Sequence, residues 1–94
     1  MANIRDIKKD INSMIEHFIQ ECYTHLTFSP PLHQENVLDI ISDAVVLKRE
    51  TIQKVNNPPA LSDRKQVRQH YKKIIGDFYD SIVDLTERLN TLQY

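Results

Sequence analysis

The sequence predicts an all-α protein, an up-down-up antiparallel bundle of three helices. Apolar residues recur at steps of three and four through most of the chain, the spacing that places side chains on one helix face. Two proline pairs divide the chain into three segments, and the chain has one glycine and few strand-type alternations. A chain of 94 residues can bury one core, so we expect a single domain, residues 1–94.

The first helix is predicted over residues 3–28. Asn3 can cap it by accepting hydrogen bonds from the first turn, and Asp6 suits the positive helix end. Pro30 and Pro31 end it, because proline lacks the N–H that an inner turn needs. Its apolar stripe contains Ile4, Ile7, Ile11, Met14, Ile15, Phe18, Cys22 and Leu26.

The second helix is predicted over residues 34–56, with two competing starts. Pro31 can serve as a first-turn residue and Asn36 as a cap. The proline pair after Asn57 stops the helix. A helix that is apolar over so wide an arc is usually covered from two sides. Its main face is expected to be Leu38, Ile41, Val45, Ile52 and Val55, beside a second stripe of Val37, Ile40, Ala44 and Leu47.

The third helix, predicted over residues 62–92, is the longest, and the other two are expected to pack on it. Ser62 is its expected cap, and Asp63 lies in its first turn. Gly76, in the middle, costs about 1 kcal/mol relative to alanine and can permit a close helix approach or a mild kink. The apolar stripe contains Val67, Tyr71, Ile74, Phe78, Ile82, Leu85, Leu89 and Leu92.

We expect the last turns of this third helix to project past its neighbours, because it spans roughly 45 Å and they span roughly 30 to 40 Å. Leu85, Leu89 and Leu92 would then be exposed and favour a symmetric homodimer that completes a larger bundle. The second stripe of the second helix is a further candidate contact. The alternative is that the loop Phe28–Leu32 folds over these leucines.

The charges are strongly polarised although the net charge is −1. In the predicted topology one end of the bundle collects eleven of the twelve cations and about +7, and the other end about −8. Each end can act on a partner as a separate patch, since the screening length is only about 8 Å. Alternatively, the charges simply fill solvated faces. The candidate partner-binding residues are Lys8, Arg49, Arg64, Lys65, Arg68 and Lys72.

Other functions have weaker support in the sequence. Nucleic acid could bind the basic end, but no glycine-rich turn, helix-turn-helix or aromatic run accompanies the cations. The candidate metal ligands are Cys22 and His25, with Glu21, His33 and a facing acid such as Asp84. Their spacing is not specific to metal sites. We therefore expect no metal, no cofactor and no catalytic residue.

Two segments resemble parts of known enzymes. The opening IRDIKKDINSMI resembles the long first helix of the small helical chorismate mutases, but no arginine follows Arg5 in this helix to bind a dicarboxylate. Arg64, His70 and Tyr71 are similar in spacing to the arginine and histidine of the HEPN ribonucleases. That resemblance implies that Arg64 and His70 would stabilise phosphate charge and transfer protons.

The function predicted from the sequence is that of a non-enzymatic protein-binding or scaffolding module with a charge-polarised surface. Nucleic-acid binding is the first alternative, and a HEPN-like ribonuclease is the second. The chain starts without an apolar signal segment, has no apolar run of about 18 residues and has one cysteine. We therefore expect a soluble cytoplasmic protein that forms homodimers, binds an unknown protein partner and does not associate with membranes.

Overall fold

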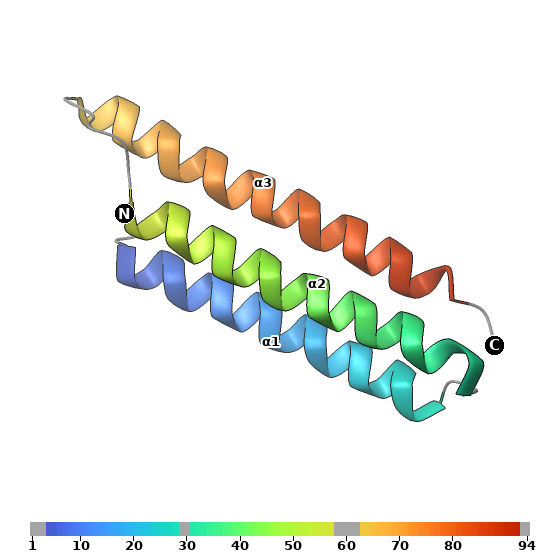
Figure 1. Ribbon diagram of the computed structural model, residues 1–94. Coiled ribbons are helices and arrows are strands. Elements are labelled where there is room, and N and C mark those ends of the chain that lie inside the picture. The colour runs from blue at the N-terminus through green and yellow to red at the C-terminus, as the bar shows by residue number, and fades with distance from the viewer. Residues whose placement is uncertain (1–3, 29–30, 58–62, 93–94) are drawn as a thin grey trace.

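The computed structural model describes residues 4–28, 31–57 and 63–92 and consists of three α-helices (Figure 1). They are α1 (Ile4–Phe28), α2 (Pro31–Asn56) and α3 (Arg64–Asn90). The molecule is a rod of 53 × 18 × 18 Å. The prediction of an all-α helical bundle is confirmed. The expected caps Asn3 and Ser62 lie outside the described residues.

Neighbouring helices lie side by side in opposite directions. The start of α1, the end of α2 and the start of α3 lie at one end of the rod (Figure 1). Two contacts fix the direction of α3 against α2. The Tyr71 hydroxyl lies 3.5 Å from the Val55 carbonyl oxygen, and Arg88 bonds Asp43 at 2.8 Å. The early part of α3 therefore lies beside the late part of α2.

Of the two competing starts of the second helix, the structure has the earlier one, since α2 begins at Pro31, ahead of the predicted bound at residue 34. Proline is tolerated there because the N–H of a first-turn residue has no partner within the helix. Asp63 is the N-cap of α3 rather than a first-turn residue, and its Oδ1 accepts the backbone N–H of Lys65 at 3.0 Å.

The core runs along the rod as one apolar cluster from all three helices. Most of the predicted stripe of α1 is buried as expected. Met14, Ile82 and Leu92 are among the half-buried side chains packed against the cluster. The buried apolar residues are Ile7, Ile11, Ile15, Phe18, Cys22, Val37, Ile40, Ala44, Val55, Ile74, Phe78, Leu85 and Leu89.

The prediction for the core face of α2 was wrong in part. The expected main face has Leu38 at 52% exposure and Val45 also exposed, whereas Ile40, in the second stripe, is only 2% exposed. Val55, assigned to the main face, is buried on the same side as the second stripe. Both stripes are equally apolar, so periodicity could not choose between them. The packing of α1 and α3 decides which stripe is buried, because both helices pack on the side of Val37 and Ala44.

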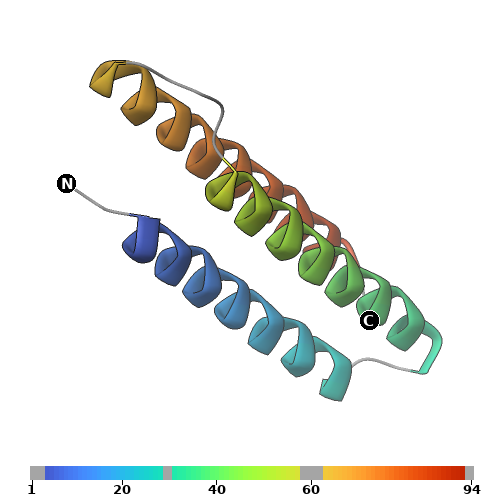
Figure 2. The same cartoon turned by 60° about the vertical axis from the view of Figure 1, so that its left-hand side comes forward.

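The prediction that the end of the third helix projects was also wrong. Leu85 is buried, Leu89 is 1% exposed, and Leu92 is half-buried against the core. The first turns of α3 project instead (Figures 1 and 2). The leucines at the end of α3 complete the core, whereas Val67 is the only apolar residue in the first turn and a half. Phe28, at the start of the loop expected as an alternative cover, is exposed, and residues 29 and 30 of that loop lie outside the described residues.

Of the two roles considered for Gly76, a close helix approach is not seen among the described residues. A Cβ built at Gly76 would meet no atom within 4 Å among those described. Glycine is therefore not required there by packing within one chain.

We predict that Ile40→Ala lowers the free energy of unfolding by about 2–5 kcal/mol, because it leaves a cavity in the core. Leu38→Ala is the matched control, with the same α2 location and an exposed side chain, and should cost less than about 0.5 kcal/mol. Urea denaturation followed by circular dichroism measures both. A larger loss for Leu38→Ala would contradict the assignment of the buried face.

Candidate functional site

The basic end of the rod is the first candidate site. Because Tyr71 contacts Val55, near the end of α2, and His70 faces Thr51 and Lys54, the part of α3 before His70 extends beyond α2. This segment, Arg64–Gln69, is called the α3 overhang below. It carries three of the six predicted binding residues, all exposed: Arg64, Lys65 and Arg68.

The other three predicted residues lie on the body of the rod. Lys72 follows the overhang on α3 and is exposed. Arg49 is exposed on α2, and Lys8 is half-buried on α1. The structure thus gathers half of the predicted set on one projecting helix and distributes the rest over all three helices.

Local helix stability does not favour this charge arrangement. Cations in the first turns of α3 face the positive end of the helix dipole, which costs some tenths of a kcal/mol for each charge. Asp63 offsets part of this as an acidic N-cap. At the opposite end of α3, Arg88 pairs with Asp43 across to α2.

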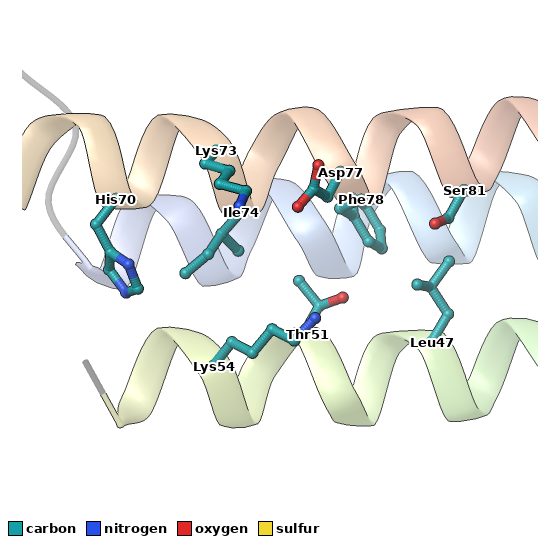
Figure 3. Close-up of a pocket in the computed structure, with 9 residues that line it drawn as sticks. All are labelled: Leu47, Thr51, Lys54, His70, Lys73, Ile74, Asp77, Phe78 and Ser81. Carbon is teal, nitrogen blue, oxygen red and sulfur yellow. The ribbon is translucent and has the colours of Figure 1, made fainter. Parts of the chain in front are cut away.

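A cleft between α2 and α3 is the second candidate site. It encloses about 280 Å³ and lies directly beside the overhang (Figure 3). Two ammonium groups, an imidazole, two hydroxyls and one carboxylate line it over an apolar floor. The lining residues are Leu47, Thr51, Lys54, His70, Lys73, Ile74, Asp77, Phe78 and Ser81.

His70 is the least satisfied group of this cleft. Its Nε2 is buried and has no hydrogen-bond partner among the described residues, and its ring lies edge-on to Tyr71 with the ring centres 5.3 Å apart. Arg64, its partner in the ribonuclease resemblance, is exposed at the start of α3. Six residues of helix leave two side chains about 120° apart around the axis, so Arg64 and His70 point to different faces.

Lys54 and Lys73 were not among the predicted binding residues, although they line this cleft. A signal exists in the sequence for Lys73, but not for Lys54 on the other helix. His70, Lys73 and Asp77, followed by Ser81, recur at steps of three and four beside the apolar stripe of α3. The cations and hydroxyls can donate hydrogen bonds to a small anionic group.

The proposed metal ligands do not form a site. Cys22 is fully buried, and burial, with a smaller contribution from the negative charge of Glu21, raises the pKa of its thiol from 9.0 to about 11. A neutral thiol is a poor ligand, since metals bind the thiolate. Among the described residues no three His, Cys, Asp or Glu side chains are grouped to hold a metal ion.

Comparisons with protein-family models, curated proteins and solved structures give no match to this chain. Within residues 4–28, 31–57 and 63–92, the helices are too polar or too short to cross a membrane.

We predict that Cys22 in the folded protein reacts with a disulfide reagent at pH 8 more than about a hundredfold slower than in the urea-unfolded protein. Two pKa units reduce the thiolate fraction by that factor, and burial blocks access as well. Absorbance of the released thiol reports the rate. Equal rates in both states would contradict the burial of Cys22.

The same raised pKa gives a pH dependence. Well below pH 9 the thiol is almost entirely neutral in both states and hardly affects stability. As the pH rises from 9.0 to about 11, the unfolded thiol ionises while the folded one stays neutral, so stability falls. Cys22→Ala should lack this part of the alkaline decline in urea denaturation.

We predict that His70→Leu leaves the free energy of unfolding unchanged or raises it by about 1 kcal/mol. The exchange removes a buried nitrogen that no group in the described part of the chain hydrogen-bonds. Gln69→Leu, on the neighbouring exposed position, is the control and should change stability by less than about 0.5 kcal/mol. A clear loss for His70→Leu alone would show that Nε2 holds a hydrogen bond in solution.

Proposed function

We propose that this protein is a non-enzymatic binding module that docks the acidic surface of another protein with its basic end. The α3 overhang is the observation that carries the proposal. It places Arg64, Lys65 and Arg68 on a helix end that does not lie against α2. A partner can therefore surround the overhang on more sides than it could surround a helix packed along the rod.

The charges on the overhang do not stabilise the fold, but they can help to recognise a partner. They oppose the dipole of their own helix, so they are retained at a small cost in stability. Charges at the rim of an interface chiefly raise the association rate and select against wrong partners. Such a module would assemble proteins through charge complementarity, with Lys8, Arg49 and Lys72 extending the same surface.

An acidic protein is favoured over nucleic acid because the overhang offers no platform for base stacking. Tyr71 follows the overhang, but its hydroxyl lies against α2 and its ring is half-buried. The exposed tyrosines Tyr23 and Tyr79 lie on α1 and on the middle of α3. Nucleic acid therefore stays the alternative, bound through phosphates alone.

The cytoplasm is the compartment that we propose for this interaction. The sequence has one cysteine, Cys22, which is free and buried, so the fold does not depend on an oxidising compartment.

We predict that replacing Arg64, Lys65 and Arg68 by glutamine weakens binding to an acidic Glu/Asp-rich peptide by about threefold to a hundredfold, since each exposed charge pair contributes about 0.2–1 kcal/mol. Fluorescence anisotropy of the labelled peptide measures the affinity. Capture from a nuclease-treated lysate on wild-type and variant protein would then identify natural acidic partners.

The matched control replaces Arg5, Lys9 and Lys48 by glutamine. It removes the same net charge from the same half of the molecule but leaves the overhang intact. Equal losses in both variants would overturn a role for the overhang. Tighter binding to duplex DNA or RNA than to the peptide, with a steep fall between about 50 and 200 mM salt, would establish the nucleic-acid alternative.

A further inference from the structure

The middle of α3 presents an apolar face to solvent. Ile75, Tyr79 and Val83 follow one another at steps of four, which places them one above the other on the helix surface. All three are exposed, and Tyr79 is 57% exposed. The core side of the same helix is formed by other residues, so these three are not needed to hold the bundle together.

Gly76 lies beside this face. A Cβ there would meet no described atom within 4 Å, so the packing of one chain does not explain the glycine. Glycine in mid-helix lowers helix stability, but it also removes the side chain that would keep another helix away. Its position therefore suits an approach by a second molecule from outside.

The charges on α3 reverse at this apolar face. Cations precede it, and carboxylates dominate after it. Lys72 lies one turn before Ile75, and Glu87 lies one turn after Val83, and both are exposed. The cations are Arg64, Lys65, Arg68, Lys72 and Lys73, and the acids are Asp77, Asp80, Asp84 and Glu87.

We propose that a second copy of this chain docks antiparallel on the face formed by Ile75, Tyr79 and Val83, with the two-fold axis beside Tyr79. This arrangement places Ile75 of each copy opposite Val83 of the other. It also brings Lys72 of each copy next to Glu87 of the other. A parallel arrangement would instead set basic half against basic half and acidic against acidic.

This dimer differs from the one predicted from the sequence, which used Leu85, Leu89 and Leu92. Those leucines are occupied in the core of a single chain. Three side chains and their neighbours cover less than the roughly 800 Å² per partner of a standard interface. The association is therefore reversible and depends on concentration. It does not depend on the proposed binding by the α3 overhang.

The first experiment is sedimentation equilibrium over a concentration series. The wild type shifts from 11.1 kDa towards twice that mass. Tyr79→Glu abolishes the shift, whereas Val46→Glu, at an exposed apolar position of α2, leaves it unchanged. Circular dichroism verifies that both variants fold. A monomer up to about 1 mM, or a dimer that survives Tyr79→Glu, overturns the proposal.

A charge exchange tests the predicted cross-copy pair. Lys72→Glu and Glu87→Lys each raise the dissociation constant by about tenfold, because like charges then face each other across the interface. The double variant restores binding to near the wild-type value. Additive weakening in the double variant overturns the pairing of Lys72 with Glu87.

Cross-linking tests the orientation, in a Cys22→Ser background. Ile75→Cys mixed with Val83→Cys forms a disulfide-linked dimer under mild oxidation, and Ile75→Cys alone does so much less. The reverse result shows a parallel pair and overturns the antiparallel proposal. Binding of the acidic peptide by the monomeric Tyr79→Glu variant distinguishes failure of this dimer from failure of the overhang.

Discussion

The burial of one stripe of α2 holds this structure together. Val37, Ala44 and Val55 are fully buried, and α2 contacts α1 and α3 more extensively than those two helices contact each other. The rotation of α2 decides which of its two apolar stripes enters the core and which polar residues border it. Because Thr51 and Lys54 border that stripe, the cleft beside α3 follows from the same choice.

The sequence predicted the existence and order of the helices, and most of the buried stripe of α1, because a clear 3.6-residue period marks one face. It could not predict the core face of α2. Leu38 and Ile40 are equally apolar neighbours, and only the packing of two other helices separates them. It also could not predict the offset of α3, since helix lengths do not fix how one helix slides along another.

The candidate sites also differ in how much of each could be predicted from the sequence. The charge polarity that defines the basic end could be predicted from the sequence, since it needs only the order of the helices. The cleft could not, because Lys54 and Lys73 come together only through the rotation of α2 against α3. The overhang could be predicted only in part. Its cations were predicted as binding residues, but its projection depends on Leu85 and Leu89 being used in the core.

The pairing of helices along the rod also bears on how fast the chain folds. Each helix packs chiefly against the next one in sequence, and the contact between α1 and α3 is the smallest. Contacts between sequence neighbours require little loop closure, and helical proteins of this kind fold in microseconds to milliseconds. Since α2 is the shared partner, a hairpin of α1 with α2 or of α2 with α3 could nucleate the bundle, and the remaining helix would dock afterwards.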